Sequence, residues 1–401
     1  MKRFLIPLVA FWLLTDIIST ASSAAIDTDS SGDSILDGSM EDLNARFQLW
    51  QVEYKKDYKT AKDLAERLEI WIQNHCKFMN YWVYHTYGQW SFIVFYGGLL
   101  MLIPTHLFAV MMQAHNHQVP SPSYNMGHNQ FSDLTLMEFQ QYNFLGPFSP
   151  GLLTPDRIKT NQQVGDIAMT HRMLRDLPVS VDWNVEGAVT PIKNQGACGS
   201  CWAYSAIGAI EGARFLDTRE LVSLSEQQLV DCDTLDSGCQ GGLMDNAFMF
   251  DENSTGICSE EDYPYAGRKH WIRGCFEKKG LCDDVPHTRV KSFFDVNGTN
   301  LDLMSAIRFQ PVSVAIQADQ MAFQFYKTGV LSGDCGVQVD HGVLAVGYGT
   351  TDENEDFWLV KNSWGSTWGD SGFIKLARDS KTIEEGMCGI LTHASRPQLE
   401  D

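Results

Sequence analysis

The residues with the clearest chemistry lie in a loop of small residues that leads into an apolar segment. Positions 195–206 read QGACGSCWAYSA, and Cys201 stands where the loop gives way to a helix expected over 202–210. The amino end of a helix carries partial positive charge, which lowers the pKa of a thiol and favours the nucleophilic thiolate. Gln195 can point an amide N–H at the same place and donate to an oxyanion. One short segment could therefore supply a nucleophile and the group that stabilises the charge it generates.

The spacing of Cys198 and Cys201 allows two other interpretations. Cysteines separated by two residues can form a redox-active dithiol or half of a zinc site. A redox protein would require a disulfide between these two cysteines. The sequence shows no cluster of metal ligands, no glycine-rich phosphate loop and no nucleotide motif, so we expect neither a metal nor another cofactor.

The residue that follows the second cysteine favours the nucleophile. The run CGSCW at 198–202 resembles the signature of papain-like and cathepsin-like cysteine proteases. This resemblance extends over about 177–397, and a propeptide resemblance covers about 47–139. It implies a cysteine endopeptidase, more similar to cathepsin L than to cathepsin B, that is made as a zymogen. It further implies an α+β fold with a helical lobe and an antiparallel β-barrel-like lobe, preceded by a helical inhibitory propeptide.

Two further residues complete the catalytic set that the resemblance implies. His341 lies 140 residues after Cys201, in the range typical of this signature. An imidazole beside a thiol can take its proton and later protonate the leaving amine. Asn362, in the run NSWG that contains Trp364, would orient that imidazole. Gln195 and the backbone N–H of Cys201 would form the oxyanion hole, and hydrolysis would pass through a thioester.

The same resemblance implies a substrate cleft. Gly241 and Gly242 would let an extended peptide pair with the backbone. His393 maps to the floor of the pocket for the P2 residue, two positions before the scissile bond, where its protonation would favour polar or acidic side chains. No His-His insertion of the cathepsin B type is apparent, which favours an endopeptidase. The other residues mapped to the cleft, mostly apolar, are Leu243, Met244, Ala315, Val339, Gly342 and Trp364.

Cysteine parity agrees with a free nucleophile. Nine of the ten cysteines lie in the predicted mature region, and an odd number in an oxidising compartment leaves one free thiol. The resemblance implies that Cys201 is this free thiol and that six other cysteines form three disulfides. Cys258 and Cys282 are then left over, and we predict that they form a fourth disulfide. The three implied pairs are Cys198 with Cys239, Cys232 with Cys275, and Cys335 with Cys388.

The chain is predicted to have three parts. Residues 1–24 combine two basic residues, an apolar run and a small-residue cleavage site, as in a secretory signal peptide. Residues 25–176 would form the propeptide, with the junction cut on activation at 171–176, and residues 177–401 the papain-like catalytic domain. The signal predicts secretion or delivery to a lysosome or vacuole, and the sequons at Asn253 and Asn297 suit that route.

Partners follow from charge and from the resemblance. The net charge of −20 argues against nucleic acid as a partner and suits an acidic compartment. We expect protein and peptide substrates, the chain's own propeptide as an intramolecular inhibitor, and a monomer. A non-catalytic binding protein that retained the fold is the alternative, although its catalytic positions are intact.

The predicted propeptide contains two motifs and an interruption. A helical spacing of one residue per turn starts at Asp63 and runs through Arg67, Trp71 and Asn74 to Phe78, and a second motif reads GHNQFSD at 127–133. Both resemble the propeptide motifs of the papain family. Between them, residues 81–113 include an apolar run of transmembrane length at 91–112. An inserted apolar hairpin or a translated non-coding sequence is expected in preference to a membrane span, because a span would leave the cysteine-rich domain on the cytosolic side, where disulfides do not persist.

Overall fold

A computed structural model describes residues 40–77, 123–143, 177–270, 274–275, 282–333, 335–378 and 384–400. The predicted signal peptide, the interruption at 81–113, the activation junction at 171–176 and Phe78 of the first propeptide motif lie outside these residues.

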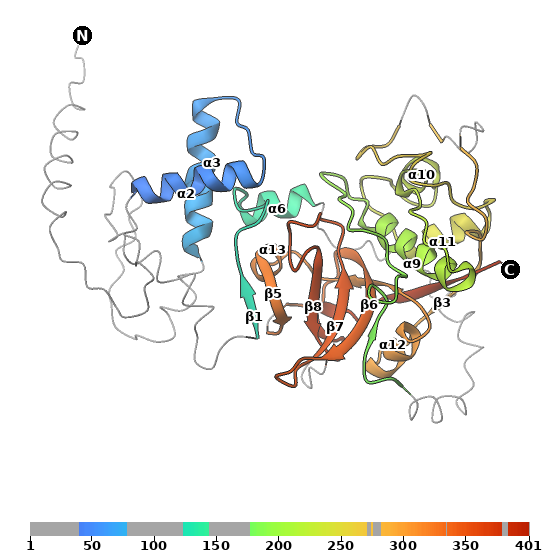
Figure 1. The fold of residues 1–401 in the computed structure, drawn as a ribbon. Helices are drawn as coiled ribbons and strands as arrows, with labels where there is room; N and C mark the ends of the chain where they lie inside the picture. Colours follow the sequence, from blue (N-terminus) through green and yellow to red (C-terminus); the bar gives the residue numbers. More distant parts are fainter. Residues whose placement is uncertain are drawn as a thin grey trace, which may run out of the picture.

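Three helices form the first half of the catalytic region. Helix α9 (Cys201–Thr218) is buried along most of its length, because most of its residues are apolar or small. Helix α10 (Glu226–Cys232) starts at Ser225, whose side chain accepts a hydrogen bond from the Gln228 N–H as an N-cap. Helix α11 (Met244–Glu252) packs against α9, and the three helices enclose an apolar core. They lie together on one side of the molecule (Figure 1).

A sheet dominates the second half, and Figure 1 shows it beside the helices. Its order is β1-β5-β8-β7-β6-β4-β9-β3, with β2 also paired to β6. The pairings are antiparallel except that of β5 with β8, which is parallel. The strands are β1 (Tyr124–Met126), β2 (Val181–Asp182), β3 (Val290–Asp295), β4 (Val312–Ile316), β5 (Tyr326–Leu331), β6 (His341–Thr350), β7 (Asp356–Lys361), β8 (Phe373–Ala377) and β9 (Ala394–Leu399); the short helices beside them are α12 (Asn300–Ile307), α13 (Met321–Gln324) and the 3-10 helix η4 (Met387–Gly389).

The predicted strands at 312–316, 342–346 and 357–360 are confirmed as β4 and as parts of β6 and β7. Residues of β4 are all buried, and only the last residue of β6 is exposed. Strands buried on both faces read as continuous apolar runs, which explains why the runs are visible in the sequence.

Small residues on α9 bring the helical and sheet parts together. A Cβ at Gly212 would lie 2.6 Å from the Pro311 ring, and one at Gly208 would lie 2.8 Å from Leu344 Cδ2. On the same side of α9, Ser205 Oγ donates to the Val343 carbonyl at 2.6 Å. The helix can therefore pack directly on β6 and on the residues that lead into β4.

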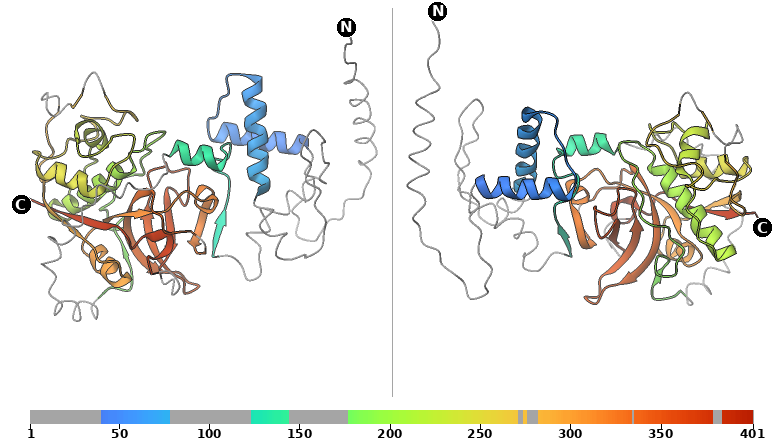
Figure 2. Two further views of the ribbon diagram at one scale, coloured as in Figure 1. Left: turned by 180° about the vertical axis from the view of Figure 1, so that it is seen from behind. Right: turned by 45° about the horizontal axis from the view of Figure 1, so that its top comes forward.

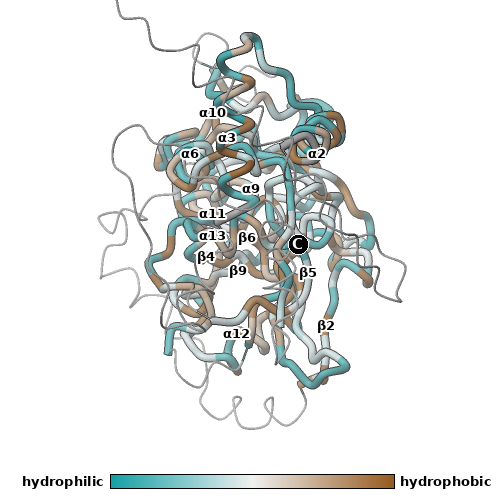
Figure 3. The backbone as a smooth tube through the Cα atoms, turned by 90° about the vertical axis from the view of Figure 1, so that its left-hand side faces the viewer, coloured by the Kyte–Doolittle hydropathy of each residue, from teal (hydrophilic) through white to brown (hydrophobic). Residues whose placement is uncertain are grey.

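The pro-region forms a separate layer that is joined to the catalytic sheet. Helices α2 (Met40–Glu53) and α3 (Ala61–Lys77) cross each other at one end of the molecule, and α6 (Leu136–Tyr142) lies between them and the sheet (Figures 1 and 2). Along α3, hydrophobic and hydrophilic residues alternate with each turn (Figure 3). Strand β1 extends the catalytic sheet by pairing antiparallel with β5.

Replacing Gly212 tests this packing. In Gly212→Ala the added methyl group meets the rigid Pro311 ring, and such overpacking costs about 1–3 kcal/mol, more than the roughly 1 kcal/mol gained in helix propensity. We expect a lower thermal unfolding midpoint for the purified protein. An equal or higher midpoint would show that the two parts are not in tight contact there.

Candidate active site

Cys201 is the first residue of α9, at the junction of the helical and sheet parts. It is 8% exposed, and among the cysteines whose side chains the structure describes it is the one without a disulfide. Ser200 occupies the N-cap position but does not cap the helix, because its hydroxyl bonds the Tyr265 hydroxyl at 2.7 Å. The backbone N–H groups at the start of α9 therefore face the site without a side-chain acceptor from Ser200.

His341 is placed beside Cys201 by the packing of β6 on α9. His341 is the first residue of β6, and a Cβ on the next residue, Gly342, would lie 3.3 Å from the carbonyl carbon of Cys201 and 3.2 Å from Trp202 Cα. The strand thus touches the helix where both elements begin. This contact brings together two residues that are 140 positions apart in the sequence.

The His341 ring is held on two sides. Its Nε2 lies 2.8 Å from Asn362 Oδ1, and its face stacks on Trp364 with the ring centroids 4.7 Å apart. Because the amide oxygen is an acceptor, Nε2 carries the hydrogen and Nδ1 is the basic nitrogen. Nδ1 is buried and has no hydrogen-bond partner among the described residues. The arrangement leaves one nitrogen free to take a proton.

The Gln195 amide is fixed by bonds at both of its ends. Its Oε1 accepts from Ser363 Oγ at 2.6 Å, and its Nε2 donates to the Cys198 carbonyl at 3.0 Å. The Gln195 backbone N–H also bonds the Ser363 carbonyl at 2.8 Å. An amide nitrogen has two hydrogens, so one N–H remains for a negatively charged oxygen. Sequence reasoning missed Ser363, because nothing in the sequence marks a serine that contacts a residue 168 positions away.

Burial determines the charge of the pair in this form of the chain. It raises the pKa of Cys201 to about 11, although hydrogen bonds from the Gly342 and Trp202 backbone oppose the rise. Burial also lowers the pKa of His341 to about 4, against the hydrogen bond to Asn362. The expected lowering of the thiol pKa by the helix end is therefore not found here, because burial outweighs it. Both shifts favour a protonated thiol and a neutral imidazole in the proform.

The residues mapped to the substrate cleft lie close together. Met244 Sδ would be 3.2 Å from a Cβ on Gly342, and the His393 carbonyl accepts from the Ala315 N–H at 2.9 Å. Gly241 has a φ of +110°, a conformation that favours glycine, and a Cβ there would meet no atom within 4 Å. Leu243, Met244, Ala315 and Val339 are buried.

His393 is half-buried beside an acidic residue. Burial lowers its pKa, and the charge of Asp295 opposes that effect. Burial likewise raises the pKa of Asp295 to about 6, with a further rise from Asp245. A protonated His393 would therefore have a carboxylate next to it, which the sequence did not indicate.

Four disulfides join the remaining described cysteines. They are Cys198–Cys239, Cys232–Cys275, Cys258–Cys282 and Cys335–Cys388, the same four pairs that were expected. Because Cys198 is bonded to Cys239, the redox interpretation loses the disulfide that it requires. The sequon residues Asn253 and Asn297 are exposed.

Comparison with known proteins decides the family. The profile described as "Papain family cysteine protease" matches residues 177–398. The chain belongs to the papain family of cysteine proteases. A senescence-specific cysteine protease, SAG39 of Oryza sativa subsp. japonica, is 37% identical over 358 residues, which cover 88% of this chain and 90% of that protein.

Solved structures of family members include the pro-region. The proform of the ragweed pollen allergen Amb a 11, a cysteine protease, is 29% identical, with a TM-score of 0.70 and coverage of 94% of this chain and 100% of that chain. Digestive procathepsin L 3 of Tenebrio molitor is 30% identical, with a TM-score of 0.66 over 89% of this chain and 99% of that chain. The two-lobe α+β fold and the identity of the chain as a papain-like cysteine protease zymogen are therefore confirmed.

The described ranges contain neither a cluster of metal ligands nor a helix of membrane-spanning character. None of their histidine, cysteine, aspartate and glutamate side chains form a group of three or more that could hold a metal ion. No helix in the described part of this papain-family chain is long and apolar enough to cross a membrane.

Gly242 offers a test of the cleft geometry. A Cβ at Gly242 would lie 2.6 Å from Asp236 Cγ and 2.6 Å from the Trp202 ring, so Gly242→Ala must displace the segment that ends at Leu243. We expect KM for peptide substrates to rise by about tenfold or more, because substrate pairing with this backbone is weakened.

The matched control is Gly349→Ala on β6, where the added Cβ would meet only the movable end of the Phe357 ring at 3.1 Å and the Ser180 side chain. Equal KM values for Gly242→Ala and the wild type would contradict the assignment of this segment to substrate binding.

Proposed function

We propose that the chain is the zymogen of an endopeptidase in which Cys201 is the nucleophile, His341 the acid and base, Asn362 the residue that orients His341, and Gln195 an oxyanion donor. The observation that carries this proposal is the placement of His341. Its ring is fixed between Asn362 and Trp364 at the start of β6, where β6 packs on the first residues of α9. A base held at one nitrogen and free at the other, next to a helix-terminal thiol, suits acyl transfer.

Each step of the proposed reaction has a group to perform it. His341 Nδ1 takes the proton of Cys201, and the thiolate attacks the peptide carbonyl carbon. The resulting oxyanion accepts from the free N–H of Gln195 and from the Cys201 backbone N–H. The imidazolium then protonates the leaving amine, which leaves a thioester. Water, deprotonated by His341, attacks the thioester and releases the new carboxylic acid and the thiol.

Removal of the pro-region would change the charge of the catalytic pair. The neutral thiol and imidazole of the proform follow from burial. Solvent access would relieve that burial, lowering the pKa of the thiol and raising that of the imidazole toward an ion pair. We propose that the zymogen is inactive because its thiol is buried and protonated.

Specificity is proposed from the residues at the cleft. Leu243, Met244, Ala315 and Val339 are apolar and adjacent, which suits an apolar P2 side chain. The acidic neighbour of His393 modifies the earlier expectation: Asp295 would offset the charge of a protonated His393, so we propose only a weak gain for acidic P2 residues at low pH.

The pro-region is proposed to inhibit through contacts with the active-site tryptophan. Phe131 and Phe139 pack edge-on against Trp364, with centroids 5.7 Å and 5.3 Å from its ring. Gln130 Nε2 donates to the Trp364 carbonyl at 2.6 Å. Trp364 is also the residue that stacks on His341, so the pro-region is anchored directly behind the catalytic imidazole.

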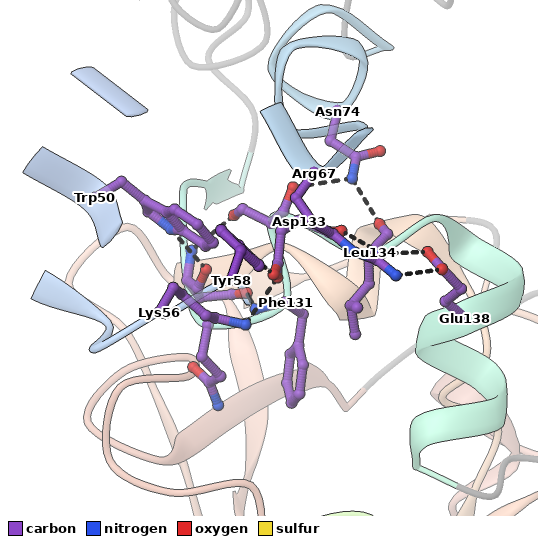
Figure 4. A network of polar contacts seen from close by, with 12 residues as sticks. Trp50, Lys56, Tyr58, Arg67, Asn74, Phe131, Asp133, Leu134 and Glu138 are labelled. Carbon is purple, nitrogen blue, oxygen red and sulfur yellow. Dashed lines mark hydrogen bonds and ion pairs between the residues drawn. The ribbon is translucent and has the colours of Figure 1, made fainter. Parts of the chain in front are cut away.

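Ionic contacts hold the pro-region segment that makes these contacts (Figure 4). Asp133 accepts from Lys56 Nζ at 2.8 Å and from the Tyr58 hydroxyl at 2.7 Å. Arg67 forms two hydrogen bonds of 2.9 Å with Glu138. Burial alone would raise the pKa of Glu138, but the hydrogen bonds from Arg67 and Thr135 outweigh it, and the pKa is lowered. The stability that Glu138 contributes is thus lost as the pH falls through its lowered pKa.

A histidine pair adds to this acid sensitivity. His75 Nδ1 and His128 Nε2 are 2.7 Å apart, and Trp71 stacks on His128 with centroids 4.5 Å apart. Burial, the neighbouring His75 and Arg46 on α2 lower the pKa of His128 from 6.5 to about 3. In the unfolded pro-region, His128 is protonated below about pH 6.5, but in the folded pro-region it stays neutral until about pH 3. The folded pro-region therefore loses stability as the pH falls from 6.5 toward 3. We therefore propose that acid pH releases the inhibitory pro-region from the catalytic domain.

Further features of the proposal concern location and organisation. Four disulfides suit an oxidising compartment, so we propose a route through the secretory pathway to a lysosome, vacuole or the exterior. The proposed division remains a signal peptide over 1–24, a propeptide over 25–176 and a catalytic domain from 177 onward, acting as a monomer on proteins and peptides.

Two substitutions test the catalytic roles. In the acid-activated enzyme, Gln195→Ala removes one oxyanion donor and should lower kcat by about 10²–10³. Asn362→Ala frees the His341 ring and should lower kcat by about 10² or more, with KM little changed. Steady-state kinetics with a peptide substrate measures both effects. Variants that retain wild-type kcat while folding normally would contradict these roles.

Acid activation is tested at His128. His128→Leu keeps an apolar contact with Trp71 but removes the titrating ring, so the purified proform should convert to mature enzyme more slowly than wild type at about pH 5. The matched control is His287→Leu, a half-exposed histidine in the catalytic region that is paired with Asp217. If His128→Leu and His287→Leu proforms convert at the same rate as wild type, His128 has no part in acid release.

A further inference from the structure

Two buried acidic side chains lie beneath the glycine segment of the cleft. Asp233 is 1% exposed and Asp236 is 8% exposed, and both come from the loop after α10. The carboxyl carbon of Asp236 would be 2.6 Å from a Cβ on Gly242, so its carboxyl group packs directly against the segment assigned to substrate binding.

Asp236 bonds the wall of the cleft through one oxygen. Its Oδ1 accepts from the Leu243 backbone N–H at 3.0 Å and from Asn246 Nδ2 at 2.9 Å. The first bond fixes the end of the glycine segment, and the second ties it to α11. Asp233 uses one oxygen in the same manner, since its Oδ1 accepts from the Leu235 N–H at 2.7 Å.

The other oxygen of each carboxyl group has no donor. Asp233 Oδ2 and Asp236 Oδ2 are buried and have no hydrogen-bond partner among the described residues. The two carboxyl groups are nevertheless within hydrogen-bonding reach of each other. Two buried carboxylates in contact cannot both stay ionised without a strong repulsion, but one proton between them converts the repulsion into a short hydrogen bond.

We propose that Asp233 and Asp236 share one proton, and that this protonated pair positions the Gly242–Leu243 wall for substrate binding. The proposal rests on the assignment of that wall to the cleft of the endopeptidase. The proton sits on Asp236 Oδ2 and is donated to Asp233 Oδ2, because Asp236 Oδ1 is already occupied by two donors. The pair is a positioning device and takes no part in the bond-breaking steps.

The electrostatic surroundings agree with this arrangement. Burial, together with the charge of Asp233, raises the pKa of Asp236 to about 8. Burial also raises the pKa of Asp233, while the Leu235 N–H, the hydrogen bond with Asp236 and the charge of Lys269 lower it. Among the described residues, Lys269 is a charged group that acts on the pair, whereas Asn246 and the Trp202 ring beside Asp236 and Gly242 are neutral.

Substrate binding should weaken at alkaline pH. Below about pH 8 the pair holds its proton, and Asp236 keeps its hydrogen bond from the Leu243 N–H. As the pH rises through that value both groups become charged, and repulsion moves Asp236 away from the wall. KM should then rise, whereas kcat should be unaffected by this pair.

The test compares KM and kcat across pH for acid-activated enzyme. Wild-type KM should rise by about tenfold between roughly pH 6 and pH 9, the effect of losing one backbone hydrogen bond in the wall. In Asp236→Asn the amide still accepts from Leu243 and always donates to Asp233, so KM should stay low and constant. Asp236→Ala removes both bonds and should show a high KM at every pH.

Asp251→Asn is the matched control. Asp251 is also a buried carboxyl group, with a pKa raised by burial to about 7, but it lies at the far end of α11 and bonds Val290 and Ser254. This variant should keep the wild-type rise in KM. A wild-type rise that persists in Asp236→Asn, or that disappears in Asp251→Asn, would overturn the proposal.

Infrared spectroscopy separates failure of this proposal from failure of the proposed function. In the difference spectrum between wild type and Asp236→Asn, which cancels the bands of other buried acids such as Asp251, a carboxylic-acid C=O band should be present at low pH and disappear as the pH rises through about 8. The measurement needs no catalysis. Absence of this band from the difference spectrum would refute proton sharing, whereas a protein with the band but without peptide hydrolysis would refute the endopeptidase assignment alone.

Discussion

The contact between the first residues of β6 and the first residues of α9 is the constraint on which the active site depends. Gly342 lies against the Cys201 and Trp202 backbone, and this packing brings His341, the proposed acid and base, toward the Cys201 end of α9. Neither element could position its residue alone, because the thiol belongs to the helical part and the imidazole to the sheet. The small residues along α9 serve the same end, since they let the helix and the strand approach closely over several turns.

A buried cluster of charges supports that contact from behind. Lys193 Nζ bonds Glu211 at 2.9 Å and Glu226 at 2.6 Å, which joins the loop before α9 to α9 and α10. Lys361 is the last residue of β7 and precedes Asn362. Its Nζ donates to the Thr190 hydroxyl at 3.0 Å, and Thr190 in turn donates to Glu211 at 2.6 Å. Burial lowers the pKa of Lys361 to about 8, and the charges of Glu211 and Glu226 oppose that effect. Removing one member would leave a buried charge uncompensated, so the cluster ties the orientation of the site to the junction of the two lobes.

The sequence was informative where one local pattern determines one structure. The apolar runs that became β4, β6 and β7, the helix after Cys201 and the helical spacing that starts at Asp63 belong to this class. It was uninformative where function depends on contacts between distant residues. The bond from Ser363 to Gln195, the pairing of His75 with His128 and the position of Asp236 under Gly242 have no local signal. The raised pKa of Cys201 in the proform has no local signal either, because the helix end is visible in the sequence and the depth of burial is not.

Labelling of the Cys201 thiol would show directly whether this residue is the nucleophile and whether the pro-region controls its reactivity. The proform and the acid-activated enzyme are each treated with an epoxide that reacts with thiolates, and the adduct is located by mass spectrometry. The account predicts an adduct on Cys201 in the activated enzyme and little or none in the proform, where the thiol is buried and protonated. Equal labelling of both forms would contradict the proposed control of the thiol by the pro-region. Folded, activated protein that carries no adduct on Cys201 would contradict its role as the nucleophile.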